Sequence, residues 1–343
     1  MVIDFNNLNI NNLHFQTDFE RKIHSFLIEW LSDSQTVTVK TSGSTGAPKI
    51  FEIEKNKMLN SAKMTCDFLE LYKNNTALVC LPIEYISGKM MVVRAFERKL
   101  QLIISDPSLK PLEDLHSEID FCALTPLQVE NSLDKIHYIK NLIIGGAAVS
   151  ESLKTKITQT LQHTNTPTRI YETYGMSETL SHIALKEIHP EQNNYFTVFD
   201  QISIAKDERG CLKISAPNLN DEILETNDLV EIKNENQFRF LGRIDHVINS
   251  GGAKIFPEEL EALVKKEMQN EVVFLGLEDE SLGQKLIAVI EGKESNDLIK
   301  KIEGIQYEKS FHKPKEIIFV EEIPRTQNGK VNRIELRRMI ERS

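Results

Sequence analysis

Short β-rich runs alternate with helix-like segments between Thr36 and Thr173. Residues 36–40, TVTVK, alternate apolar and polar side chains as a strand does, whereas residues 55–72 repeat apolar side chains at helical spacing. The series continues with strand-like runs at 76–81, 101–104, 121–124, 141–146 and 168–173, and with helices expected at 88–98 and after Ser150. Strands that alternate with helices predict a layered α/β unit with a largely parallel sheet.

The pattern changes near Tyr195. Residues 195–217 and 237–243 are typical of an antiparallel, β-rich patch, and a new unit begins beyond it. In that unit Pro257 is well placed as the first residue of a helix. We therefore predict a large N-terminal domain at 1–243 and a small, mobile α+β domain at 244–343.

Charge and cysteine usage exclude several classes of protein. Acidic residues outnumber basic ones, 51 to 41, and the net charge of −10 repels DNA and RNA, although a local nest of N–H groups can still hold a small anion. The four cysteines show no CxxC spacing, so we expect neither a zinc site nor a disulfide framework, and we expect a cytoplasmic location. No signal peptide pattern opens the chain, and no apolar run reaches the length of a membrane span.

The stretch TSGSTGAPK at 41–49 has the composition of either a phosphate-binding loop or a solvated linker. Gly43 and Gly46 accept positive φ, so successive N–H groups can point into one concavity. Hydroxyl groups and one cation surround them, from Thr41, Ser42, Ser44, Thr45 and Lys49. A Walker A loop is excluded, because only two residues separate the glycines and a proline follows. Composition alone leaves the linker and the phosphate loop open.

This stretch resembles the phosphate loop of the adenylate-forming superfamily, which includes acyl-CoA synthetases, adenylation domains and luciferases. Four further segments of the family pattern follow in order: YETYGMSET (171–179), TNDLVEI (226–232), FLGRIDHVINSGGAKIFPEELE (240–261) and PRTQNGKVNR (324–333). Ordered matches of this kind make chance implausible. The resemblance implies the adenylate-forming fold and an AMP-forming acid–thiol ligase that uses ATP, Mg²⁺ and coenzyme A.

The resemblance also implies a role for each site residue. Residues 41–49 would hold the β- and γ-phosphates, and Lys330 would stabilise the transition state of adenylation. Glu178 would hold Mg²⁺, and Ser177 would bind the α-phosphate. The rest of the nucleotide site would consist of Gly145, Gly146, Ala147, Tyr174 and Gly175, with Asp228 and Arg243 at the ribose.

The hinge of the family falls at Asp245. After adenylation the small domain would rotate about this residue and remove the Lys330 loop from the active site. The same rotation would bring Gly251 and Gly252 to the channel for the CoA thiol. The resemblance therefore implies two half-reactions in two arrangements of the domains.

The segment LPIEYISGKMMVVRAF at 81–96 resembles a segment of the acyl pocket in o-succinylbenzoate–CoA ligases of menaquinone synthesis, with Tyr85 in place of the usual histidine. Nearby cations favour an acid with a second carboxylate, because a fatty-acid tunnel needs none. The candidate pocket residues are Tyr85, Lys89, Arg94, Ser181 and His182. The implied reaction converts o-succinylbenzoate, ATP and CoA to o-succinylbenzoyl-CoA, AMP and pyrophosphate.

Several alternatives remain open at this stage. Lys89 and Arg94 could instead face solvent or pair with Glu84 or Glu97. The enzyme could activate another aryl or acyl acid, or load a carrier protein, since Gly251 and Gly252 suit either pantetheine arm. A non-catalytic adenylate-binding protein is disfavoured by the intact Glu178 and Lys330.

The resemblance is incomplete at the N-terminal end. Relatives usually carry well over a hundred residues before the phosphate loop, whereas Thr41 follows only 40. We therefore expect a reduced N-terminal subdomain, with a helix at 19–31 that Trp30 packs down. A second copy of the chain, in a homodimer, is a candidate cover for the surface exposed by this reduction.

Overall fold

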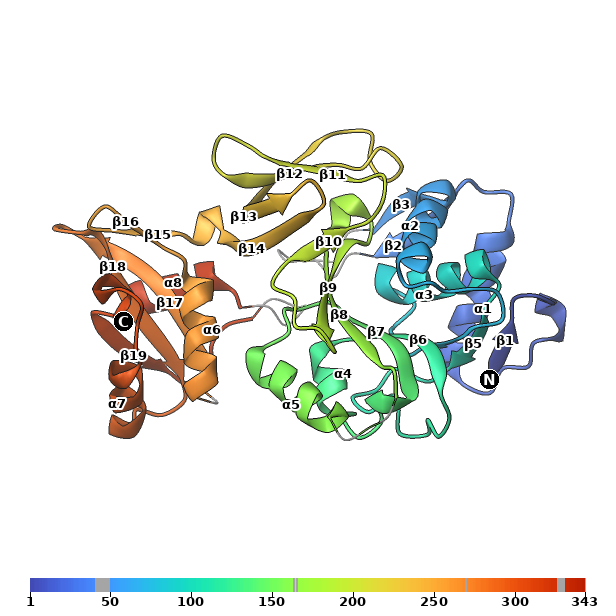
Figure 1. Ribbon diagram of the computed structural model, residues 1–343, viewed down its shortest axis with the longest axis horizontal. Helices are drawn as coiled ribbons and strands as arrows, with labels where there is room; N and C mark the ends of the chain where they lie inside the picture. The colour runs from blue at the N-terminus through green and yellow to red at the C-terminus, as the bar shows by residue number, and fades with distance from the viewer. Residues whose placement is uncertain (41–49, 163, 165, 269, 326–330, 343) are drawn as a thin grey trace.

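The computed structural model describes residues 1–40, 50–162, 164, 166–268, 270–325 and 331–342. A larger and a smaller body of structure follow one another along its longest axis, and the two termini lie toward opposite ends (Figure 1). The strands of the larger body are β1 (Val2–Asp4), β2 (Thr36–Lys40), β3 (Ile50–Glu54), β4 (Thr76–Val79), β5 (Gln101–Ile104), β6 (Ile119–Leu124), β7 (Ile139–Ile144), β8 (Arg169–Gly175), β9 (His182–His189), β10 (Phe196–Val198), β11 (Ser203–Lys206), β12 (Cys211–Ser215), β13 (Leu224–Asn234) and β14 (Gln237–Arg243).

Twelve of these strands form one sheet, in the order β1-β5-β4-β6-β7-β8-β9-β10-β14-β13-β12-β11. The run from β5 through β8 is parallel, as the alternation of strands and helices predicts. The antiparallel patch is not a separate layer, because β9 pairs with β8 on one side and with β10 on the other. The parallel half and the antiparallel half are therefore continuous, and β8 and β9 lie where they meet.

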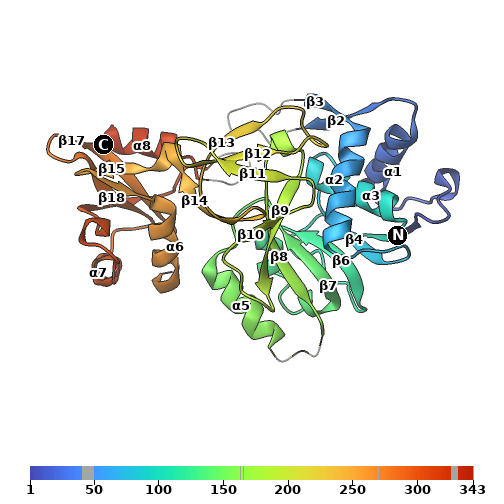
Figure 2. The same cartoon turned by 45° about the horizontal axis from the view of Figure 1, so that its top comes forward.

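Helices cover both faces of the parallel strands (Figures 1 and 2). Successive residues of a strand point to opposite faces, and in β4 Ala77 belongs to one hydrophobic core and Leu78 to the other. The first core contains side chains of three helices, α1 (Asp18–Leu31), α2 (Lys55–Phe68) and α3 (Ile86–Arg98). The second contains side chains of α4 (Pro126–Glu130) and α5 (Glu151–Leu161). The layered α/β class is therefore confirmed.

Local predictions for the helices also hold. Ser150 caps α5, since its side-chain oxygen accepts the N–H of Leu153 at 3.1 Å. The helix expected at 19–31 is α1, and Trp30 is buried on it against the rings of Phe26 and Phe96. Helix α1 thus closes the core at the end of the sheet where β1 and β5 lie.

The smaller body has its own sheet and core. Its strands are β15 (Ile248–Ser250), β16 (Ala253–Ile255), β17 (Val272–Asp279), β18 (Gly283–Glu291) and β19 (Glu316–Val320), and its helices are α6 (Pro257–Glu267), α7 (Asn296–Gly304) and α8 (Arg333–Glu341). Pro257 is the first residue of α6, as predicted. The larger sheet ends at Arg243 and the smaller begins at Ile248, which favours the boundary between 243 and 244 that we propose.

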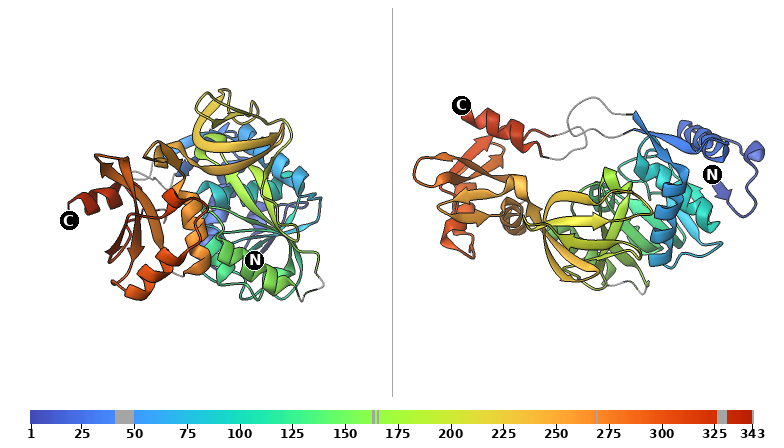
Figure 3. Two further views of the ribbon diagram at one scale, coloured as in Figure 1. Left: turned by 60° about the vertical axis from the view of Figure 1, so that its left-hand side comes forward. Right: turned by 90° about the horizontal axis from the view of Figure 1, so that it is seen from above.

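The two bodies are joined end to end, as the view from above shows (Figure 3). The short helix η4 (Ile244–His246) connects them, and α6 packs beside α5 of the larger body. In the part of the chain that the structure describes, no helix is both long enough and apolar enough to cross a bilayer.

Candidate active site

Five of the described nucleotide candidates lie at the carboxyl ends of two neighbouring parallel strands. Gly145, Gly146 and Ala147 follow β7, and Tyr174 and Gly175 end the neighbouring strand β8. Glu172 of β8 accepts the backbone N–H of Val149 at 3.1 Å and so ties the loop after β7 to the next strand. In α/β sheets, ligands bind at this edge, so the structure brings these candidates together at an edge suited to a nucleotide.

Tyr174 and Asp228 meet across the antiparallel half of the sheet. The Tyr174 hydroxyl donates to the Asp228 carboxylate at 2.5 Å, and the Tyr174 ring packs against Phe196 and Phe238. Burial, together with the negative charge of Asp228, raises the pKa of Tyr174 far above its ordinary value, so the hydroxyl keeps its proton. The pair places a fixed aromatic ring beside a carboxylate. This arrangement suits the binding of a nucleotide base and its ribose.

Arg243 links Asp228 to the predicted hinge residue. Its Nη1 lies 3.5 Å from Asp228, and its Nε and Nη2 donate to the two carboxylate oxygens of Asp245, each at 2.9 Å. Burial by itself would raise the pKa of Asp245, but the hydrogen bonds and charge of Arg243 hold it below its ordinary value. The connection between the two bodies thus carries a bidentate ion pair that reaches the candidate ribose carboxylate.

Ser177 and Glu178 are exposed residues of the helical turn η3 (Ser177–Thr179), which begins two residues after Gly175. The backbone carbonyl of Glu178 accepts a hydrogen bond from Asn220 at 3.0 Å, and its exposed carboxylate forms no ion pair with a described residue. Within the described ranges, no group of three or more His, Cys, Asp or Glu side chains could hold a metal ion. Magnesium is usually held by one or two carboxylates together with substrate phosphates, so Glu178 fits this ion in company with ATP.

Gly175 allows the closest approach of backbone segments in the site. It pairs with His182 of β9, and a Cβ atom at Gly175 would lie 2.4 Å from the His182 Cα and 2.5 Å from the Ser181 carbonyl oxygen. Any side chain at this position must push the first residue of β9 away. The glycine therefore sets where Ser181 and His182 stand.

We expect Gly175→Ala to destabilise the fold by about 1–3 kcal/mol, the usual cost of overpacking, and to lower activity further by displacing Ser181 and His182. Urea unfolding and steady-state kinetics measure the two effects. Gly304→Ala is the control, because no atom lies within 4 Å of the position where its Cβ would stand. Unchanged stability of Gly175→Ala would contradict the close approach.

Three of the five candidate acyl-pocket residues form one cluster around the buried Arg94. Arg94 is 2 % exposed and donates from Nη2 to the Ser181 hydroxyl at 3.1 Å, and the Ser181 hydroxyl lies 3.4 Å from Nδ1 of His182. Among the described residues, the buried Arg94 Nε has no hydrogen-bond partner, and no carboxylate forms an ion pair with this guanidinium. Burial lowers the pKa of Arg94 to about 10, so it stays charged at neutral pH.

The other two acyl-pocket candidates lie elsewhere. Lys89 and Arg94 are five residues apart on α3, about 140° around a helix, and Lys89 turns toward α1. There its Nζ lies 3.9 Å from the Glu29 carboxylate and 4.2 Å from the centroid of the Phe26 ring. Burial lowers the pKa of Lys89. Tyr85 precedes the first residue of α3 and is 42 % exposed.

The sequence analysis missed Thr65 of α2, which is fully buried and lies 3.1 Å from Nε2 of His182. Its only sequence signal is that a threonine interrupts the apolar stripe of α2 beside Cys66. A polar residue in a stripe is too common to single out. Only the structure shows the contact between Thr65 and His182, because the two residues are 117 positions apart in the chain.

The candidate CoA residues form a tight turn. Gly251 and Gly252, with φ of 57° and 81°, connect β15 and β16, in which Ser250 pairs with Ala253. Positive φ at both central residues is typical of a type I′ hairpin and favours glycine. The phosphate-loop candidates at 41–49 and Lys330 lie outside the described residues. The strands on either side of that loop, β2 and β3, pair with each other, as a hairpin requires.

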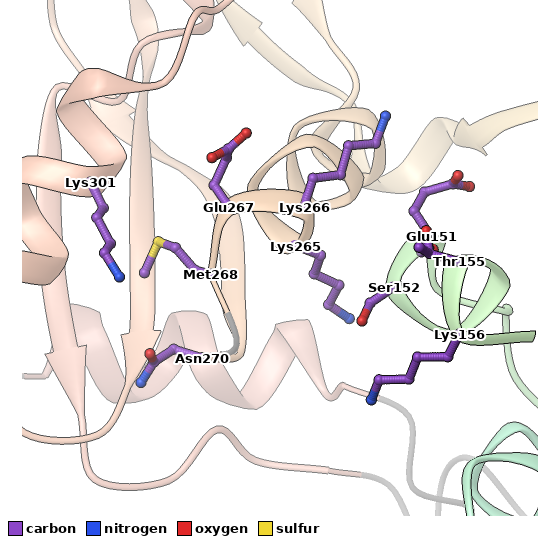
Figure 4. Close-up of a pocket in the computed structure, with 10 residues that line it drawn as sticks. All are labelled: Glu151, Ser152, Thr155, Lys156, Lys265, Lys266, Glu267, Met268, Asn270 and Lys301. Carbon is purple, nitrogen blue, oxygen red and sulfur yellow. The ribbon is translucent and has the colours of Figure 1, made fainter. Parts of the chain in front are cut away.

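A cavity of about 900 Å³ lies between α5 and the smaller body (Figure 4). None of the candidate residues lines it, and its lining is mostly charged: Glu151, Ser152, Thr155, Lys156, Lys265, Lys266, Glu267, Met268, Asn270 and Lys301. Two of its lysines, Lys156 and Lys265, already pair with Glu130 and Glu271. It lacks an aromatic or apolar wall for a base or acyl group, so we place the active site at the ends of β7 and β8.

Comparison with known proteins identifies the family of the chain. The model of the AMP-binding enzyme family matches residues 28–209, and that of the AMP-binding enzyme C-terminal domain matches residues 257–330. The chain belongs to the AMP-binding enzyme family. Both matched segments contain candidate residues, and the AMP-binding domain spans the loop after β7 and the end of β8.

Individual relatives align with most of the length of this chain. The 2-succinylbenzoate–CoA ligase of Lactococcus lactis is 27% identical over 326 residues, 88% of this chain and 70% of that protein. An acyl-CoA synthetase (AMP-forming)/AMP-acid ligase II-like protein from Dyadobacter fermentans is 32% identical in its crystal structure, with a TM-score of 0.65, and covers 96% of this chain and 97% of that one. The O-succinylbenzoate coenzyme A synthetase of Bacillus subtilis, solved with ATP and magnesium, shares the fold at 20% identity, with a TM-score of 0.72 and coverage of 88% and 69%.

Proposed function

We propose that this AMP-binding enzyme activates a carboxylic acid with ATP and transfers the acyl group to coenzyme A. In the first step, a carboxylate oxygen of the acid attacks the α-phosphorus, and pyrophosphate leaves. In the second, the CoA thiolate attacks the acyl carbonyl and AMP leaves. The ligase names of its relatives support this reaction, as does the grouping of the nucleotide candidates at one edge of the sheet.

Different residues of this chain have different roles in the first step, the formation of the acyl-adenylate. Tyr174 packs on the base and, with Arg243, holds the Asp228 carboxylate that accepts the ribose hydroxyls. Glu178 would hold Mg²⁺ against the phosphates, where the ion supplies charge neutralisation at the phosphate oxygens. The loop at 41–49 and Lys330 are assigned to the phosphates and the reacting carboxylate by the family resemblance.

We propose o-succinylbenzoate as the acid, and the observation that carries this choice is the buried guanidinium of Arg94. A charge removed from water costs several kcal/mol unless it is paired, yet the described partners of Arg94 are only the Ser181 hydroxyl and the Met91 sulfur. An acid with a second carboxylate supplies the missing charge, and a bidentate carboxylate matches the guanidinium in geometry. Several relatives are 2-succinylbenzoate–CoA ligases.

A second candidate function has one observation in its favour. The 3,4-dihydroxybenzoate–[aryl-carrier protein] ligase of Bacillus anthracis is 25% identical over 332 residues, 89% of this chain and 74% of that protein. An enzyme of this kind adenylates the acid and then loads a carrier protein. Turnover with free CoA separates the two functions.

A pyrophosphate-release assay with a panel of acids tests the proposal. We expect release with o-succinylbenzoate and Mg·ATP, and o-succinylbenzoyl-CoA as the product once CoA is added. Activity with benzoate or medium-chain fatty acids, but none with o-succinylbenzoate, would overturn the choice of acid. Adenylation without CoA turnover would favour the carrier-protein function, and no release with any acid would favour a non-catalytic adenylate-binding protein. The cytoplasmic location and the homodimer stay predictions.

A further inference from the structure

A chain of polar side chains runs from Arg94 into the core of the larger body. Arg94 Nη2 lies 3.1 Å from the Ser181 hydroxyl, which lies 3.4 Å from Nδ1 of His182. His182 Nε2 lies 3.1 Å from the Thr65 hydroxyl, which lies 3.1 Å from the backbone carbonyl of Ser61. These groups come from α3, the segment before β9, β9 itself and α2. Because Arg94 and Thr65 are buried, the hydrogens at the two ends of this chain need partners within it.

The deep end of the chain fixes the tautomer of His182. A hydroxyl carries one hydrogen, and that of Thr65 is donated to the Ser61 carbonyl. Thr65 can therefore only accept from His182, so Nε2 must carry a hydrogen. Burial, aided by the charge of Arg94, lowers the pKa of His182 well below its ordinary value and keeps the ring neutral. A neutral ring with its hydrogen on Nε2 has no hydrogen on Nδ1, which can then only accept a hydrogen bond.

The unprotonated Nδ1 of His182 in turn orients the Ser181 hydroxyl. An imidazole nitrogen without hydrogen accepts, so the Ser181 hydroxyl donates to it and turns its lone pairs toward Arg94. Every hydrogen then points the same way, from the guanidinium toward the Ser61 carbonyl. With the opposite tautomer, His182 and Arg94 would both donate to the Ser181 hydroxyl. His182 would then compete with the guanidinium for the lone pairs of Ser181.

We propose that Thr65 is a positioning residue that sets the specificity for the second carboxylate by orienting Arg94 through His182 and Ser181. The inference rests on the proposed function, in which Arg94 binds that carboxylate. Ser181 holds one nitrogen of the guanidinium, and the buried Nε, which has no partner in the described part of the chain, is left for the substrate. In this proposal Thr65 acts only through His182, its side-chain partner in the described structure.

The kinetic test compares Thr65→Val with Thr65→Ser. Valine keeps the shape of threonine but removes the hydroxyl, whereas serine keeps the hydroxyl. We expect Thr65→Val to raise KM for o-succinylbenzoate about tenfold, the effect of one lost hydrogen bond, with KM for ATP and the unfolding midpoint little changed. Thr65→Ser should restore most of the loss. Equal rises in both KM values, or no rescue by serine, would show a merely structural role and overturn the proposal.

The second test needs no turnover, so it stands even if the proposed acid is wrong. The ¹⁵N chemical shifts of the imidazole nitrogens report which one carries hydrogen, and the spectrum of His182→Gln identifies the His182 signals among the nine histidines. We expect a neutral ring with hydrogen on Nε2 in the wild type, and a larger share of hydrogen on Nδ1 in Thr65→Val. A wild-type ring that is cationic, or that carries its hydrogen on Nδ1, would overturn the relay. If o-succinylbenzoate gave no activity but His182 showed the expected tautomer, only the choice of acid would be overturned.

Discussion

Replacing Arg94 with methionine is expected to lower kcat/KM for o-succinylbenzoate by about a hundredfold to a thousandfold, the usual cost of removing one partner of a buried charge pair. KM for ATP should stay within about twofold, because the described hydrogen-bond partners of the Arg94 guanidinium are Met91 and Ser181 and include neither Tyr174 nor Asp228. Steady-state kinetics with each substrate varied in turn measures both effects. The physical reason is that the second carboxylate would lose its only buried cation in the described part of the acyl cluster.

The stability of the same variant separates binding from folding. Arg94 is a buried cation without a described carboxylate partner, so an apolar side chain of similar size should leave the unfolding midpoint unchanged or raise it. Arg98→Met is the matched control, because Arg98 lies one turn further along α3 and pairs with Asp67 nearer the surface. If Arg94→Met kept full activity with o-succinylbenzoate, Arg94 would not be the carboxylate site.

The second large effect concerns the two half-reactions. We expect Lys330→Ala to lower the rate of adenylate formation by about a hundredfold to a thousandfold, as removal of a charge-stabilising group in a transition state does, while much of the thioester step from supplied acyl-adenylate remains. Gly251→Leu should do the opposite, because a bulky side chain at the β15–β16 turn would fill the CoA channel. Pyrophosphate release measures the first step, and thioester formation from synthetic acyl-adenylate measures the second.

Two controls accompany these variants. Lys313→Ala removes another lysine, in an exposed position, and should change neither step. Gly251→Asn keeps the backbone conformation, because asparagine tolerates positive φ, so it separates the bulk of leucine from strain in the turn. If Lys330→Ala and Gly251→Leu each lost both steps to the same extent, the rotation of the small domain about Asp245 would be wrong for this enzyme.

Much of the fold could be predicted because its signals are local. The cap at Ser150, the stripe of α5 and the proline that opens α6 each depend on residues within one or two turns of each other. The nucleotide candidates Tyr174 and Gly175 came instead from the family resemblance of the contiguous segment 171–179, which is also a local signal. The continuity of the sheet could not be predicted, because the pairing of β8 with β9 depends on partners and not on composition.

The acyl cluster shows the same limit at the level of single side chains. Lys89 and Arg94 look equivalent in the sequence, and only the packing of α3 turns one toward α1 and the other toward Ser181. Thr65 gave no useful signal at all, although it contacts His182.

The amino-acid sequence by itself determined the order of strands and helices, the family and the residue types of the nucleotide site, because hydrophobic period, caps and contiguous segments are properties of neighbouring residues. Only the tertiary structure decided which distant side chains meet. Contacts such as that of Thr65 with His182, 117 residues apart, depend on how α2, α3 and β9 pack around one core. That packing leaves the buried guanidinium of Arg94 without a described carboxylate partner, and the proposed choice of acid depends on this guanidinium.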